Sequence, residues 1–216
     1  IERISEIQLG DMLLIFEQET DYRRVGFYMI PADMKEKDVS SKKFYRINSL
    51  AQLKLVGDIY PNCYGSGQTM HNCETANLFE YDSQTTEEAE GKTYIRTVMK
   101  DQRGYGLVNV ITWYHGEDSF EMKNIFTNNS EDTVTLEMLS SFEMGNVTPF
   151  VEGIATDTLL VHRLRSKWSH EGRLVTETVE DLQLEPSWSN WSVGVERFGQ
   201  RGSMPVMKYF PFVAVE

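Results

Sequence analysis

The sequence is poor in cysteine, in positive charge and in long apolar runs, and each shortage excludes a class of protein. Two cysteines, Cys63 and Cys73, occur among 216 residues, too few for a disulfide scaffold, although one bond between them stays open. No apolar run approaches the roughly 20 residues of a membrane-spanning helix. Lysine and arginine number 21 against 33 aspartates and glutamates, a net charge of -12. We therefore expect no nucleic-acid partner and no membrane partner, because both surfaces are anionic.

Motifs for metals, nucleophiles and phosphates are also missing. The histidines form no i, i+4 pair and no Cys-x-x-Cys occurs, so zinc-site spacing is absent. The four are His71, His115, His162 and His170. Gly65-Ser66-Gly67 matches neither a Gly-x-Ser-x-Gly elbow nor a phosphate-binding glycine loop. We therefore predict no metal and no cofactor.

Aromatic residues make up 12% of the chain, and they favour pleated, half-buried surfaces. Residues 106–116 alternate between two faces, 119–127 resumes after a turn, and 128–132 is a second turn before 133–142. We predict a β-meander from these three segments. Further strands are predicted at 4–9, 12–19, 25–30, 52–57, 76–81, 93–100, 157–168, 172–184, 192–198 and 209–215.

The pattern predicts an all-β fold, a large antiparallel β-sandwich, in one continuous domain covering residues 1–216. Polar residues 84–91 are predicted to be a solvated loop, and 32–41 a short helix or a loop. The side chains expected to be largely buried are Trp113, Phe120, Phe126, Leu136 and Phe142.

Two segments hold more polar and aromatic side chains than a sandwich needs. The first runs from Gly57 to Asn72, and the second from Trp168 to Pro205. Aromatic rings stack on the apolar faces of sugars, while amide, carboxylate and guanidinium groups hydrogen-bond the hydroxyls. Because tryptophan more often anchors a core or an interface, this composition alone only suggests a sugar site.

Several stretches resemble glycoside hydrolase family 36, the microbial α-galactosidases. Two of them are Arg163–Leu174, which contains Lys167-Trp168-Ser169-His170-Glu171, and Glu196–Pro205. Leu55–Asn72, Trp113–Asp118 and the ending Tyr209-Phe210-Pro211-Phe212 also match. The matches lie in order across residues 52–216.

The resemblance implies an N-terminal β-supersandwich of the galactose-mutarotase type, followed in the family by a catalytic (β/α)8 barrel. The barrel supplies two aspartates for retaining hydrolysis, the nucleophile within Lys-Trp-Asp. This chain has Lys167-Trp168-Ser169 and no barrel-like alternation of strand and helix. The expectation is an N-terminal domain fragment, incomplete at its C-terminus, that is inactive alone but belongs to an enzyme hydrolysing terminal α-galactosides of the melibiose and raffinose type.

The resemblance also implies partners and site residues. The partners are the catalytic barrel, neighbouring subunits of a homo-oligomer and galactoside oligosaccharides, in the cytoplasm of a bacterium. Substrate-pocket candidates are Gln68, His71, Asn72, Trp188 and Trp191. The first loop departs from the common family pattern, which carries an aspartate and an arginine. Bare apolar surface is expected around Trp188, Trp191, Met204 and Met207.

Two other functions stay open. One is a free-standing carbohydrate-binding β-sandwich. The other is a mutarotase-like enzyme, which rests on fold analogy alone. Such an enzyme needs a converging acid and base, whereas the adjacent His170 and Glu171 would point to opposite faces of a strand.

Overall fold

The computed structural model describes residues 1–20, 23–34, 47–61, 72–145, 147, 156–185, 196, 198–199 and 208–216. Of these residues 52% are strand and 3% helix, and all strand pairs are antiparallel. The predicted all-β class is confirmed. No helix among the described residues is long and apolar enough to cross a membrane.

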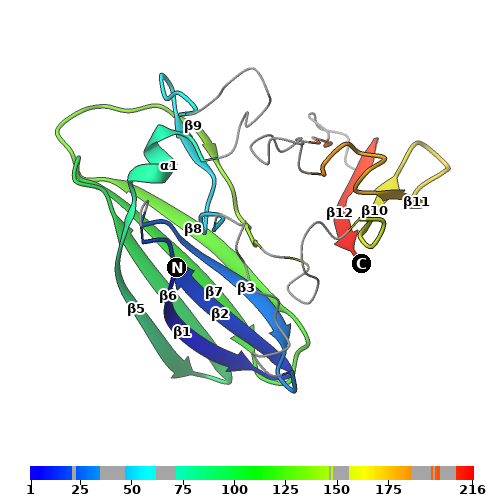
Figure 1. Ribbon diagram of the computed structural model, residues 1–216, viewed down its shortest axis with the longest axis horizontal. Coiled ribbons are helices and arrows are strands. Elements are labelled where there is room, and N and C mark those ends of the chain that lie inside the picture. Colours follow the sequence, from blue (N-terminus) through cyan, green and yellow to red (C-terminus); the bar gives the residue numbers. More distant parts are fainter. Residues whose placement is uncertain are drawn as a thin grey trace. The chain divides into compact units, whose positions relative to one another are not determined.

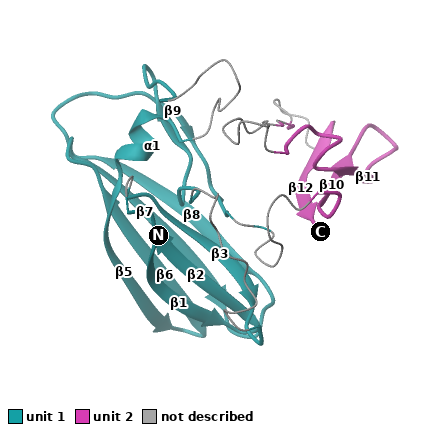
Figure 2. Cartoon of the chain, viewed as in Figure 1, with its two compact units in different colours: residues 1–61, 70–149 teal, residues 62–69, 150–216 magenta. Residues whose placement is uncertain are grey.

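The chain divides into two compact units (Figure 2). Unit 1 comprises residues 1–61 and 70–149, and unit 2 comprises residues 62–69 and 150–216. The single continuous domain stays a prediction, and each unit is described by itself.

Unit 1 begins with a three-stranded sheet, ordered β1 (Glu2–Leu9), β2 (Met12–Gln18) and β3 (Val25–Pro31). The β1–β2 hairpin turns at Gly10, whose φ of 57° lies in the left-handed region that glycine tolerates. Both faces of β3 are covered. Gly26 lies so close to the segment 47–50 that a Cβ there would meet the Asn48 carbonyl oxygen at 2.1 Å.

The second sheet of unit 1 has four strands in sequence order (Figure 1). They are β5 (Glu80–Ala89), β6 (Lys92–Lys100), β7 (Tyr105–Tyr114) and β8 (Phe120–Asn128). One apolar cluster joins this sheet to the first, as expected for a sandwich. Its buried members include Leu14, Phe16, Val25, Phe27, Leu53, Phe79, Ile95, Leu107 and Ile111.

Unit 1 also contains a two-stranded ladder of β4 (Leu53–Leu55) and β9 (Leu136–Leu139), and a short helix α1 (Glu74–Leu78). Asn124 of β8 ties this part to the four-stranded sheet. Its side-chain amide donates to the Ser140 carbonyl at 2.8 Å, and its Oδ1 accepts from Asn109 at 2.8 Å. The two hydrogen bonds of Asn124 therefore connect the end of β9 to strands β7 and β8 of the sheet.

Three local predictions for unit 1 are wrong. Residues 76–78 of the expected strand 76–81 belong to helix α1 instead, and only residues 80–81 of it are strand. The expected loop 84–91 belongs mainly to β5, which turns only at Glu90 and Gly91. β5 is an edge strand, where charged side chains face solvent and discourage unwanted pairing. The third strand of the expected meander pairs with β4 rather than with β8.

The predicted core is correct in part. Trp113, Phe120 and Phe126 are half-buried and pack against the apolar cluster. Leu136 and Phe142 are 43% and 52% exposed, so their expected burial is wrong. Alternation shows which residues share a face, but it does not show whether a second layer covers that face.

Unit 2 contains one three-stranded sheet, with β10 (Leu160–Arg165) between β11 (Arg173–Thr178) and β12 (Tyr209–Val215). These strands confirm shorter versions of 157–168 and 172–184, and the whole of 209–215. The predicted strand 192–198 lies outside the described residues, apart from Glu196 and Phe198. The expected apolar surface around Trp188, Trp191, Met204 and Met207 lies wholly outside them.

Candidate functional site around Asn72

Asn72 is the only one of the five predicted pocket residues that the structure describes. Gln68, His71, Trp188 and Trp191 lie outside the described residues. Asn72 lies two residues before α1, and its φ of 51° lies in the left-handed region, which asparagine adopts more readily than most residues. The site is therefore built outward from this position.

Hydrogen bonds hold Asn72 on several sides. Its Oδ1 accepts from Ser49 Oγ at 2.9 Å and from Gln52 Nε2 at 3.0 Å. Its backbone N–H donates to Gln52 Oε1 at 2.8 Å, and its carbonyl accepts from Asn77 Nδ2 at 2.8 Å. Asn72 is only 4% exposed, so these bonds fix the point where the predicted functional segment 57–72 meets α1.

A buried ion pair extends the network to the three-stranded sheet. Arg24 donates from Nη1 to Asn77 Oδ1 at 2.9 Å and from Nε to Glu19 Oε2 at 2.8 Å. Glu19 Oε1 also accepts from the Ile47 backbone N–H at 3.1 Å. Both charged side chains are buried, and such a pair is costly to break because either charge alone would be stranded.

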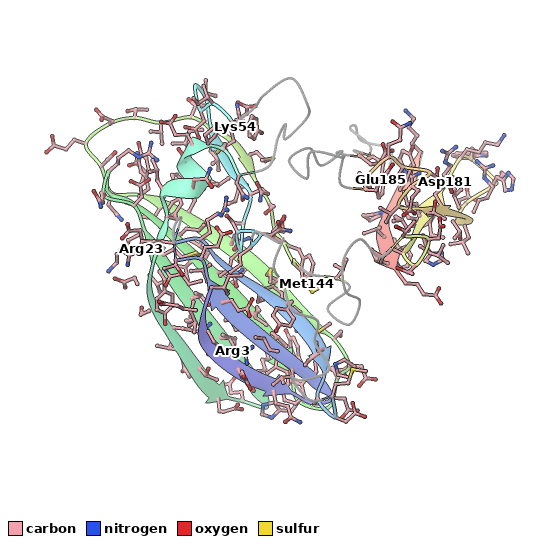
Figure 3. All side chains as sticks on the ribbon, viewed as in Figure 1. Arg3, Arg23, Lys54, Met144, Asp181 and Glu185 are labelled. Carbon is pink, nitrogen blue, oxygen red and sulfur yellow. The ribbon has the colours of Figure 1, made fainter. Side chains whose placement is uncertain are left out.

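Glu143 adds a titratable group to the network, and in the sequence it directly precedes Met144, which is labelled in Figure 3. Burial raises the pKa of its carboxyl to about 7, and a hydrogen bond with Gln52 partly opposes that rise. The Gln52 backbone fixes the neighbouring segment, since its N–H donates to Ser140 Oγ and its carbonyl accepts from the Ser140 N–H, both at 2.8 Å. A carboxyl that titrates near neutrality is typical of functional sites, although buried structural groups also show it.

Sequence reasoning missed Glu143. Nothing around Ser141-Phe142-Glu143-Met144 departs from an ordinary polar segment. The raised pKa comes from burial of the carboxyl in the folded chain, where Gln52, a residue far away in the sequence, partly opposes the rise. Only evidence that Gln52 and Glu143 are in contact could have identified Glu143 from the sequence.

A second network surrounds Asp58 at the other side of α1. Its Oδ1 accepts from Thr75 Oγ1 at 2.8 Å, and its Oδ2 accepts from the Leu55 N–H at 2.9 Å and from Cys73 Sγ at 3.3 Å. Arg103 reaches Thr75 Oγ1 at 3.1 Å. These bonds hold α1 against β4.

Cys73 is a buried free thiol, and Cys63 lies outside the described residues. Burial raises the pKa of the Cys73 thiol to about 11. The thiol stays protonated at neutral pH and is a poor nucleophile. Within the described ranges, no group of three His, Cys, Asp or Glu side chains is placed to hold a metal ion.

The motif Lys167-Trp168-Ser169 lies in the turn between β10 and β11. The His170 N–H donates to the Lys167 carbonyl at 2.9 Å, and Trp168 is 82% exposed. Glu171 Oε1 accepts from the Ser169 N–H at 2.9 Å. His170 and Glu171 thus lie in an exposed turn rather than in a strand. The Glu171 side chain stabilises this turn by accepting the hydrogen bond from Ser169.

Comparisons with known proteins give a structural match only. No protein-family model matches the chain, and no curated protein matches it. A solved structure of a family 36 α-galactosidase, AgaA from Geobacillus stearothermophilus in complex with 1-deoxygalactonojirimycin, has a similar fold with a TM-score of 0.52. The match covers 81% of this chain at 9% identity, and the chain spans 28% of the length of that enzyme. At this identity the match shows the fold alone.

Proposed function

We propose that this chain is the non-catalytic N-terminal β domain of a glycoside hydrolase related to the family 36 α-galactosidases. The observation that carries the proposal is the fold match, which covers 81% of this chain but 28% of the α-galactosidase. The ordered motifs across residues 52–216 support the same placement. The whole enzyme would hydrolyse terminal α-galactosides, with both catalytic aspartates outside this chain.

The chemistry of the described residues supports a non-catalytic role. A retaining glycosidase needs two carboxyl groups about 5–5.5 Å apart, one as nucleophile and one as acid/base. Glu143 has a pKa suited to proton transfer, but only burial and Gln52 shift it. A second carboxylate close by would have contributed to that shift, so Glu143 is not half of such a pair within the described residues.

The domain would act by presenting side chains to a pocket on the catalytic barrel. Gln68, His71, Trp188 and Trp191 are the proposed contacts, with Trp stacking on a galactose ring and the others binding its hydroxyls. Asn72 is proposed to hold the end of the first segment in place through Ser49 and Gln52. Packing on the barrel and on neighbouring subunits belongs to the same proposal.

The first experiment asks where catalysis resides. The pure 216-residue chain should release no nitrophenol from a nitrophenyl α-galactoside, whereas the protein expressed from the complete gene should. Turnover by the chain that survives repurification would contradict the non-catalytic role. An open reading frame that ends at residue 216 would refute the domain proposal outright.

The second experiment separates an accessory domain from a free-standing sugar-binding module. Calorimetric titration of the chain with galactose and melibiose should show no saturable binding, because the barrel completes the pocket. In the full-length enzyme, His71→Ala or Trp191→Ala should lower kcat/KM about ten- to a hundredfold without lowering Tm. Saturable binding by the chain alone would favour the module instead.

A further inference from the structure

The turn between β10 and β11 holds Trp168, which at 82% exposure is the most exposed large apolar side chain of the described residues. Two backbone hydrogen bonds close the turn. The His170 N–H donates to the Lys167 carbonyl at 2.9 Å, and the Lys167 N–H donates to the His170 carbonyl at 3.3 Å. Ser169 has a φ of 58°, in the left-handed region, and its N–H donates to Glu171 Oε1 at 2.9 Å. Such a conformation persists only where the surroundings hold it, so this turn is a fixed structure that presents the Trp168 ring to solvent.

Three exposed, positively charged side chains lie on and beside this turn. Lys167 directly precedes Trp168. Arg165 ends β10 and Arg173 begins β11, and the two are direct partners in the ladder. Residues directly opposite on antiparallel strands have Cβ atoms about 4.5–5.5 Å apart, and like charges there are destabilising. Arg165 and Arg173 therefore repel each other unless an anion lies between them.

Within the described part of the chain, these two arginines have neither a carboxylate partner nor an aromatic ring. Every other described arginine forms an ion pair or lies over a ring; these are Arg3, Arg23, Arg24, Arg96, Arg103 and Arg163. Glu171 is the one acidic residue between β10 and β11, and its Oε1 accepts from the turn backbone. The turn is thus a basic, unpaired patch in a chain whose net charge is -12.

The side chains of this turn combine two recognition chemistries. A guanidinium group binds a carboxylate through two parallel hydrogen bonds, and an exposed indole ring stacks on the apolar C–H face of a sugar. A ligand that uses both carries a carboxylate on a sugar. A protein partner fits less well, because aromatic anchors of protein interfaces lie in a core that is depleted of charged residues, whereas Trp168 follows Lys167 and precedes two polar residues.

We propose that the turn between β10 and β11 binds short oligosaccharides that contain uronic acid. The Trp168 ring stacks on one sugar unit, and a carboxylate of the ligand lies between Arg165 and Arg173, where it removes their mutual repulsion. Arg165 lies three residues before Trp168, at most about 10 Å away along the chain, a distance that a short oligosaccharide can span. The negative charge of the ligand thus complements the unpaired cations of the turn.

The acidic character of the whole chain limits the size of the ligand. At physiological ionic strength, exposed charges are screened beyond about 8 Å, so a short ligand is attracted chiefly by the cations of the turn. A long polyanion such as a nucleic acid would extend over the rest of a chain with a net charge of -12 and would be repelled. The inference rests on the side chains of this turn and not on the proposed function.

The test is an NMR titration of the isotope-labelled 216-residue chain, followed through the backbone amide signals of Ser169 and His170. The probes are trigalacturonate, the neutral trisaccharide galactotriose, a hexaglutamate peptide and inorganic phosphate. Trigalacturonate should shift these signals saturably and bind about tenfold more tightly than galactotriose, because only the acidic sugar engages the arginines. About 0.5 M salt should reduce that difference, since the charges are exposed.

Variants separate the two chemistries. Trp168→Ala should weaken the binding of trigalacturonate about tenfold, and Arg165→Ala or Arg173→Ala should weaken it about three- to tenfold. Arg173→Lys keeps the charge but not the paired hydrogen bonds, so it should recover only part of the loss. Without ligand, each arginine-to-alanine variant should have a Tm at least as high as the wild-type chain, because the repulsion across the ladder is gone.

The matched control is Lys123→Ala, which removes an exposed cation from β8 of unit 1 and should bind trigalacturonate like the wild-type chain. The proposal is overturned if trigalacturonate causes no saturable shift up to about 20 mM. Equal affinity for hexaglutamate or phosphate would overturn the sugar assignment, since the turn would then bind anions only. Binding that survives both Trp168→Ala and Arg173→Ala would place the ligand on another surface.

Discussion

In unit 1 two facing sheets enclose Leu14, Phe16 and Ile111, whose side chains are fully buried, whereas the sheet of unit 2 leaves Leu174 and Phe212 62% and 46% exposed. Both units have antiparallel strands. The difference is the second layer: in unit 1 a sheet covers the apolar face, and among the described residues of unit 2 a single three-stranded sheet is present. A β-sheet gains more stability from the layer that packs on its apolar face than from the hydrogen bonds between its own strands.

The two units resemble one another in how they hold a buried arginine. Arg24 in unit 1 pairs with Glu19. Arg163 in unit 2 pairs with Glu177 and Glu196, and its guanidinium lies over the Phe198 ring at 4.9 Å. Unit 2 therefore specifies a local structure through polar contacts, while Leu174, Phe212, Val213 and Val215 remain exposed.

The largest expected effect tests this contrast with one substitution in each unit. Phe16→Ala should lower the free energy of unfolding by about 3–5 kcal/mol, because it opens a cavity between two sheets. Phe212→Ala, the matched change in unit 2, should cost less than about 1 kcal/mol. Urea unfolding of both variants gives the comparison. Equal losses would show that unit 2 buries its sheet as fully as unit 1 does.

The next effect concerns the polar network that holds Asn72. Asn72→Ala removes the side-chain oxygen that accepts hydrogen bonds from Ser49 and Gln52. It also places alanine at a φ of 51°, a strained backbone conformation that no side-chain hydrogen bond then offsets. We expect a loss of about 2–4 kcal/mol in the free energy of unfolding. Asn72→Gly separates the two causes, since it relieves the backbone strain and should recover about 1 kcal/mol. If Ala and Gly are both neutral, the network does not anchor this segment.

Much of the sheet structure follows from the sequence because burial and alternation coincide there. In β6 and β7 one face is apolar and packs on the core, so period-two patterning is strong. β5 was missed because an exposed edge strand such as Glu80–Ala89 tolerates polar residues on both faces. Phe142 shows the converse, an apolar residue in an alternating run that no described layer buries.

The site is less predictable than the fold for a related reason. The segment 57–72 stands out by composition, and the family resemblance adds Asn72 within it as a pocket candidate, which stays a prediction. Glu143 acquires its raised pKa only when folding buries its carboxyl. Such a shift depends on three-dimensional neighbours, which residue spacing along one chain does not encode.

The pH dependence of stability tests whether the Glu143 carboxyl of unit 1 is desolvated. The Glu143 carboxyl has a pKa of about 7 when folded, against 4.5 ordinarily. The folded state therefore holds its proton while the unfolded state releases it, and stability falls as pH rises from about 4.5 through about 7. Glu143→Gln cannot ionise, so it should match the wild-type chain near pH 4 and exceed its stability by roughly 3 kcal/mol near pH 8.

The control for that series is Glu131→Gln, which changes an exposed carboxyl in the turn after β8. Its stability difference from the wild-type chain should stay constant across the same pH range. Thermal unfolding at each pH supplies the measurement. A Glu143→Gln curve that runs parallel to the wild-type curve would show that this carboxyl is not desolvated.

The smallest expected effect is that of replacing an exposed leucine of unit 2 by serine, a substitution that a buried leucine of unit 1 would not tolerate. Leu174 is 62% exposed on β11, opposite Leu164 of β10, so Leu174→Ser removes little buried area. The change in the free energy of unfolding should stay within about 0.5 kcal/mol, while solubility of the chain should rise because an apolar side chain leaves the surface. The matched change in unit 1 is Leu14→Ser, at a fully buried position, and it should prevent stable folding because a hydroxyl would be stranded in the apolar core. Urea midpoints and the concentration at which each variant precipitates test both statements. A large loss of stability for Leu174→Ser would mean that this side chain is covered in solution, and the contrast between the two units would then be smaller than the described residues indicate.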